Sequence, residues 1–125
     1  QTIEASKAPL TLVHIWATWC DPCREEFPEL VQVIHRFPSL EVILISADDP
    51  QETTPIEAFL VEYECPVDTL VSTELSQAFI ESISPKWGGA LPASFLIQDG
   101  RIVSEWEGKR TFDQFKEIIE MLLNK

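Results

Sequence analysis

The sequence predicts an α/β domain in which a central mixed β-sheet is covered by helices on both sides. Two observations carry this prediction. A β-α-β unit is complete by Ser46, and the chain ends in a β-hairpin followed by an amphipathic helix, which gives the order β-α-β…β-β-α. The 125 residues contain no internal repeat and no Gly/Ser linker, so we expect one domain over residues 1–125.

The first half of the chain predicts two buried strands and a helix between them. Residues 10–16 (LTLVHIW) form a nearly continuous apolar run whose one ionisable member is His14, as is typical of a central strand. Residues 42–45 predict the second strand. Pro28 lies inside the intervening helix and should kink it. Apolar side chains three and four residues apart predict that helix and its buried face: Phe27, Leu30, Val31, Ile34 and Phe37.

Two further helices are expected before the hairpin. Thr54-Pro55-Ile56-Glu57 combines a capping box with a proline at the first helical position, which predicts a short helix that starts at Thr54. Apolar spacing predicts another helix over residues 74–83.

The C-terminal part predicts a hairpin and a last helix. Residues 94–98 and 101–107 flank Asp99-Gly100, a pair typical of a type I′ turn. Thr111 then begins the last helix as its N-cap, with Gln114 completing a capping box.

The charge balance excludes some partner classes. Nine Lys and Arg against 21 Asp and Glu give a net charge of −12. A chain this acidic is repelled by phosphate backbones and by anionic lipid, so we expect no nucleic acid partner. No apolar run approaches the roughly 18 residues that a membrane span needs.

The three cysteines direct attention to chemistry. Cys20 and Cys23 form a C-x-x-C motif where the first strand meets the first helix, and Cys65 stands alone. A helix N-terminus favours a thiolate, and Pro22 suits the first turn. We expect Cys20 to be an exposed N-cap that accepts from the Cys23 N–H, and Cys23 to lie one turn inside, close enough for a disulfide. Cys20 is thus expected to attack and Cys23 to resolve a mixed disulfide.

The C-x-x-C motif is also compatible with other roles. A structural zinc ion is coordinated by four ligands. The remaining candidates lie on different elements: Cys65, His14 and His35. We therefore expect no metal and no cofactor. A purely structural disulfide is poorly placed at a helix start. A binding module with an incidental dithiol and a thiol peroxidase remain as other classes.

The motif Trp-Ala-Thr-Trp-Cys-Asp-Pro-Cys, residues 16–23, resembles the active-site signature of the thioredoxin superfamily. The stretch that follows is similar to the TlpA/ResA type of extracytoplasmic protein, which reduces disulfides, notably in cytochrome c maturation. It includes the glutamate that this subgroup uses, here Glu26. Leu91-Pro92 and the residues after them resemble the family's cis-proline loop. The resemblance spans about residues 10–123.

The resemblance implies a thioredoxin fold and a protein-disulfide reductase-type enzyme. It implies a monomer outside the cytoplasm, in the periplasm or at the outer face of a membrane, with a membrane anchor as an option for the full-length protein. The expected partners are a protein disulfide substrate and an upstream thiol donor, for which a membrane protein is one option. The carboxylates of Asp21, Glu25 and Glu26 oppose a thiolate and favour the reducing direction; a disulfide oxidase or isomerase is the alternative.

Roles for single residues follow from this resemblance. Glu26 is expected either to exchange a proton with Cys23 or to be an ordinary surface carboxylate. The Leu91 backbone is expected to pair with an extended substrate strand. The residues expected to contact substrate are Trp19, Asp21, Pro22, Leu91 and Pro92.

Three more residues have two interpretations each. His14 is expected to be a hydrogen-bonded core histidine, with a proton relay as the alternative. Trp87 either contacts a partner or anchors its loop. Cys65 is expected to be a buried, inert thiol.

Overall fold

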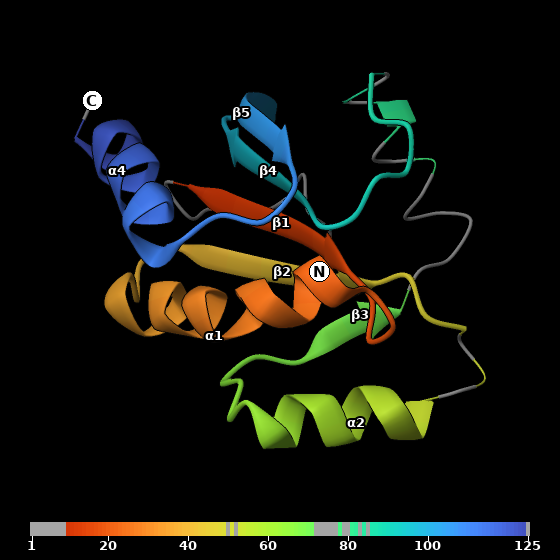
Figure 1. Cartoon of the computed structure of the whole chain (residues 1–125). Coiled ribbons are helices and arrows are strands. Elements are labelled where there is room, and N and C mark those ends of the chain that lie inside the picture. The colour runs from red at the N-terminus through yellow and green to blue at the C-terminus, as the bar shows by residue number, and fades with distance from the viewer. Residues whose placement is uncertain are drawn as a thin grey trace.

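The computed structural model describes residues 10–49, 51, 53–71, 78, 81–82, 84 and 86–124, which form a five-stranded sheet in the order β3-β2-β1-β4-β5 (Figure 1). The elements are β1 Thr11–Trp16, α1 Asp21–Arg36, β2 Glu41–Ser46, α2 Thr53–Glu62, β3 Thr69–Val71, β4 Ala93–Gln98, β5 Arg101–Glu107 and α4 Phe112–Leu123. The central strand β1 pairs in parallel with β2 and antiparallel with β4. The expected mixed sheet is therefore confirmed.

Most element boundaries agree with the sequence, and three points differ. Helix α2 begins at Thr53, one residue before the expected Thr54, a difference within the usual spread of helix ends. The three-residue strand β3 was not predicted. The helix expected over residues 74–83 lies largely outside the described residues. The expectation that helices cover both faces of the sheet is therefore not tested for the second face.

The local turn and cap signals are confirmed. Asp99 and Gly100 have φ of 55° and 76°, as a type I′ turn requires. Thr111 is the N-cap of α4, and Gln114 completes the capping box. Helix α1 continues through Pro28 without interruption.

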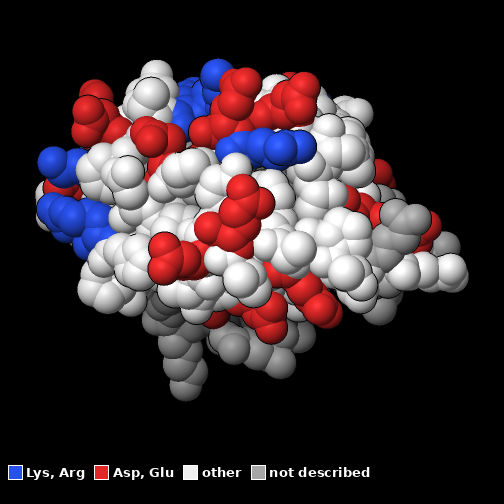
Figure 2. Space-filling model, turned by 60° about the horizontal axis from the view of Figure 1, so that its bottom comes forward, with Lys and Arg blue, Asp and Glu red and all other residues white. Residues whose placement is uncertain are grey.

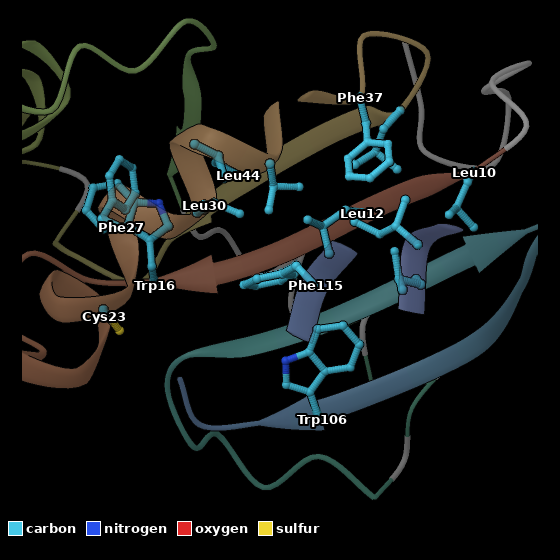
Figure 3. Close-up of a cluster of buried hydrophobic side chains, with 14 of the residues drawn as sticks. Leu10, Leu12, Trp16, Cys23, Phe27, Leu30, Phe37, Leu44, Trp106 and Phe115 are labelled. Atoms are coloured by element: carbon cyan, nitrogen blue, oxygen red, sulfur yellow. The ribbon is translucent and has the colours of Figure 1, made fainter. Parts of the chain in front are cut away.

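The larger hydrophobic cluster joins the three described helices to one face of the sheet. Leu12 and Trp16 of β1 lie in it, together with Phe27 of α1 and Phe115 of α4. Figure 3 shows Cys23 at one end of this cluster beside Trp16. The other face of β1 packs a second, smaller cluster that includes Phe95. The start of α1 is thus anchored on the larger cluster. No helix in the described part of the chain is long and apolar enough to cross a membrane.

Candidate active site

The cysteine pair lies at the start of α1, directly after the turn that follows β1. Cys20 is the N-cap residue with extended backbone, and its Sγ accepts from the Cys23 N–H at 3.3 Å. Cys20 and Cys23 are joined by a disulfide, with their Cα atoms 5.2 Å apart. The N-cap position and the pairing expected from the sequence are therefore confirmed. In the reduced protein the same N-terminus offers backbone N–H groups and a positive dipole end to a thiolate.

The expectation of an exposed Cys20 is wrong in this oxidised form. Cys20 is 7% exposed and Cys23 is fully buried. The reason is local: the Cys20 side chain turns back over the first turn of α1, where it accepts the Cys23 N–H and shares the disulfide. Cys20 remains the more exposed of the two residues, which fits the expected order of attack.

A carboxylate after β2 holds the turn that leads into the cysteines. Asp48 accepts from the Thr18 N–H at 3.1 Å and from the Thr18 hydroxyl. The Ser46 hydroxyl donates to the same carboxylate, and the Asp48 N–H donates back to the Ser46 hydroxyl oxygen at 3.0 Å. Sequence reasoning missed this contribution. The signal available was a buried strand that ends at Ser46 and is followed by Ala-Asp, beside the motif-bearing strand.

Glu26 lies on α1, three residues beyond Cys23, and is 1% exposed. Its Oε2 accepts from the Arg110 N–H at 2.8 Å, and its Oε1 lies 3.0 Å from Nε2 of His14. The pair Oε1 and Nε2 is close but not aligned as a hydrogen bond. The alternative of an ordinary surface carboxylate is therefore wrong: the helix turns this side chain into the core behind the dithiol.

His14 is a hydrogen-bonded core residue, as expected. It is 1% exposed, and its Nδ1 lies 2.9 Å from the Ser94 Oγ of the neighbouring strand β4. His14 and Ser94 are register partners in the β1–β4 ladder, so both side chains leave the sheet on the same side. The sequence did not predict the approach of His14 to Glu26, because the residues are twelve positions apart on different elements.

The carboxylates beside Glu26 are engaged with the segment that enters α4. Glu25 pairs with Lys109 at the surface. Glu29 accepts from the Phe112 N–H at 2.7 Å, one of the free donors in the first turn of α4. The Lys109 cation offsets the charge of Glu25, which weakens the expected repulsion between acidic residues and a thiolate at Cys20.

The residues expected to contact substrate differ in exposure. Trp19 is 66% exposed, directly before Cys20, and Asp21 and Pro22 are exposed as well. Leu91 is half-buried and Pro92 buried, and the peptide bond between them is cis, as the resemblance implied. The role of the Leu91 backbone in holding a substrate strand stays a prediction.

Two residues left open by the sequence are placed by their contacts. Trp87 donates from Nε1 to the Ala90 carbonyl at 2.9 Å and packs edge-on against Phe95, which favours a loop anchor. Cys65 is half-buried rather than buried, and its Sγ donates to the Val67 carbonyl at 3.3 Å. Burial raises the pKa of the Cys65 thiol, and the nearby Asp68 carboxylate raises it further.

The charges and donor groups of the described residues suggest no further site. On the face that Figure 2 shows, acidic side chains are spread among uncharged ones, and basic side chains gather at separate places. Within the described ranges, no three His, Cys, Asp or Glu residues are grouped to hold a metal ion.

Comparison with known proteins points to one family. A model of the AhpC/TSA family matches residues 2–105. The thiol-disulfide oxidoreductase ResA of Bacillus thuringiensis subsp. konkukian is 26% identical over 113 residues, which are 88% of this chain and 61% of that protein. A thiol:disulfide interchange protein, DsbE homolog, of Paracoccus denitrificans is 33% identical over 100 residues, 79% of this chain and 50% of that protein. The chain thus spans 61% or less of these two curated relatives.

Solved structures confirm the fold. A thioredoxin-family thiol:disulfide interchange protein from Chlorobium tepidum superposes with a TM-score of 0.81 at 27% identity, covering 94% of this chain and 81% of that one. StoA from Bacillus subtilis gives 0.71 at 23% identity, with 90% and 84% covered. The expected thioredoxin fold and the resemblance to ResA-like proteins are confirmed.

Proposed function

We propose, from the premise that this chain belongs to the AhpC/TSA family, that it is a thiol–disulfide oxidoreductase acting on protein disulfides. One observation carries the proposal: Cys20 and Cys23 form a disulfide at the N-terminus of a helix that begins beside the exposed Trp19. That position favours a thiolate at Cys20, the more exposed residue of the pair, and keeps Cys23 within reach. The relatives named above are thiol-disulfide oxidoreductases and interchange proteins, which supports the same chemistry.

In the reducing direction the reaction has two steps. The Cys20 thiolate attacks one sulfur of the substrate disulfide; that S–S bond breaks, and the departing substrate sulfur takes a proton. The Cys23 thiol then loses its proton and attacks Cys20 Sγ, which closes the protein disulfide and releases the second substrate sulfur as a thiol. Two electrons and two protons pass to the substrate, and an upstream thiol donor restores the dithiol.

The surroundings suggest a role for each remaining site residue. Glu26 is the proton acceptor for Cys23, because it is buried one turn further along the same helix. Trp19 offers an apolar contact surface to the substrate, beside the exposed Asp21 and Pro22. The backbone at Leu91 and Pro92 pairs with an extended segment of the substrate.

We infer that the protein reduces its substrates and works outside the cytoplasm, as a monomer. The acidic side chains near α1 disfavour the thiolate and so favour the disulfide form of this protein, although the Glu25–Lys109 pair reduces that effect. The reduction potential should then lie nearer to about −270 mV than to about −120 mV. Equilibration with glutathione, read from tryptophan fluorescence, measures it. A value near the oxidising end would favour an oxidase or isomerase instead.

Trapping of a substrate tests the proposed exchange. Cys23→Ser should hold a disulfide-containing protein as a mixed disulfide on a non-reducing gel, and Cys20→Ser should hold none. Cys65→Ser is the matched control and should reduce insulin as the unaltered protein does. Absence of insulin reduction by the unaltered protein would favour a binding module, and consumption of peroxide would favour a thiol peroxidase.

A further inference from the structure

Three buried polar side chains, here called the polar chain, lie next to one another behind the dithiol. Glu26 of α1 approaches His14 of β1, and His14 contacts Ser94 of β4; all three are 1% exposed. Burying polar groups in an apolar core is costly unless they are paired. An aliphatic side chain at position 14 would meet the pattern of a central strand equally well. Packing alone therefore does not explain a histidine at this position.

The contacts allow this group to hold a variable proton. Nδ1 of His14 is 2.9 Å from a hydroxyl that can donate or accept, so either ring tautomer can be satisfied there. Nε2 is 3.0 Å from Glu26 Oε1, while the other carboxylate oxygen is held by the Arg110 N–H at 2.8 Å. With a neutral imidazole, the His14–Glu26 pair has a net charge of about −1. With one more proton it becomes an imidazolium–carboxylate pair, whose net charge is zero.

We propose that His14 is a positioning residue that makes Glu26 a better proton acceptor for Cys23. This inference rests on the proposed thiol–disulfide exchange. When Cys23 attacks Cys20, the proton leaves the Cys23 sulfur and enters the Glu26–His14 pair as the Cys20–Cys23 bond forms. The bond between Cys20 and the substrate breaks, and its electron pair leaves with the substrate sulfur, which takes a proton from solvent. When the disulfide is reduced again, the pair returns its proton to Cys23.

The other groups around the pair come from α1, β2, β5 and the segment that leads into α4. On the register row of His14, β2 contributes Leu44 and β5 contributes Trp106. The Arg110 guanidinium lies 4.7 Å from the Trp106 ring centroid. Groups nearby that carry charge or titrate have partners of their own or belong to the reaction: Cys23, Glu25 with Lys109, and Glu29 with the Phe112 N–H. The His14 ring thus has polar contacts with one carboxylate and one hydroxyl.

The proposal predicts the direction of a pH effect. An imidazole is intrinsically more basic than a carboxylate, so we expect the pair to be a stronger proton acceptor for Cys23 than a carboxylate alone. In His14→Asn the Cys23 thiolate should form less readily, so the pH midpoint of Cys23 reactivity should move to higher pH. The resolution of a mixed disulfide at neutral pH should slow about tenfold, part of the usual effect of general acid–base catalysis.

The experiment follows Cys23 without requiring a substrate. In a Cys20→Ser/Cys65→Ser background, alkylation of the single remaining thiol is measured against pH with and without His14→Asn. His35→Asn is the matched control, because His35 is the exposed histidine of α1 and should leave the profile unchanged. Ser94→Ala provides a second, smaller perturbation and should shift the profile in the same direction. Circular dichroism checks that each variant is folded.

A double-mutant comparison decides between the two roles for His14. If His14 acts through Glu26, adding His14→Asn to Glu26→Gln changes the profile no further. An unshifted profile in His14→Asn, or effects that simply add, would make His14 a packing residue and overturn the proposal. If the unaltered protein fails to reduce insulin while its alkylation profile responds to His14→Asn, the proposed function fails and the proton pair stands.

Discussion

The two faces of the central strand β1 are built from different kinds of side chain. On one face, Val13 and Ile15 pack with Phe95 in an apolar cluster, and Thr11 is the buried polar residue of β1 on that face. On the other face, His14 lies between Leu12 and Trp16 and approaches Glu26. Apolar burial stabilises both faces, and the larger cluster lies on the second, where the buried ionisable groups His14 and Glu26 also need partners. We infer that the ionisable groups of the chemistry lie on the second face of β1, whereas apolar burial stabilises both faces.

Truncation on the apolar face should have the largest effect on stability. Phe95→Ala should lower the free energy of unfolding by about 3–5 kcal/mol, because it removes a buried ring and leaves a cavity. Urea unfolding measures this change. The pH profile of Cys23 alkylation in the folded variant should match that of the unaltered protein. A shifted profile would break the separation between the faces.

Removal of the Ser94 hydroxyl on the dithiol face should cost less stability but alter the chemistry. Ser94→Ala leaves Nδ1 of His14 without its partner and should lower the free energy of unfolding by about 1–3 kcal/mol. Ser104→Ala on β5 is a control at a less buried serine and should stay within about 0.5 kcal/mol. If both variants lower the free energy of unfolding equally, the polar chain contributes no more to stability than an ordinary serine does.

The cap of α4 sharpens the comparison, because it lies near Glu26 but outside the polar chain. Thr111→Ala removes the acceptor for the Gln114 N–H and should cost about 1 kcal/mol in urea unfolding. Thr111→Ser retains the acceptor and should cost less. Neither variant should move the Cys23 profile; a shift in Thr111→Ala would mean that the start of α4 also positions Glu26.

The smallest effect is expected at Cys65, a thiol at the rim of the larger cluster. Its pKa is raised by burial, so in a Cys20→Ser/Cys23→Ser background its alkylation should reach half its maximal rate above the usual pH for a thiol. The unfolded chain releases this proton first, so the free energy of unfolding falls as pH rises past the ordinary thiol pKa. Cys65→Ala should remove that decline. An alkylation midpoint at or below the ordinary value would contradict the prediction.

Local signals in the sequence predicted much of the fold. The Asp99-Gly100 turn, the Thr111 cap and the N-cap position of Cys20 depend on neighbouring residues, and the structure confirms each. Strand β3 has only three residues, at the edge of the sheet beside β2, which is too few for a period to be visible. Its existence depends on pairing rather than on its own sequence.

The pairing of the two cysteines could be predicted from the sequence, but the contacts of the residues around them could not. The spacing of Cys20 and Cys23 predicts their pairing, because both lie within one helical turn. The contact between Glu26 and His14 depends on how α1 packs across β1, and the Asp48 contact depends on β2 lying beside β1. The burial of Cys20 also follows from a conformation of its side chain that spacing does not specify.

The polar chain also has a consequence for how the strands find their alignment. His14 faces Ser94 only in the observed pairing of β1 with β4; a slip of one residue would bring Phe95 or Ala93 opposite the imidazole. Because side chains alternate along a strand, the same slip would turn the Ser94 hydroxyl into the apolar cluster and leave Glu26 and His14 buried with one partner fewer. Apolar strands such as these offer little else to tell one alignment from the next. The three polar groups therefore help to specify the register of β1 and β4. Forms of the sheet in another register are less stable, whether or not any thiol reacts.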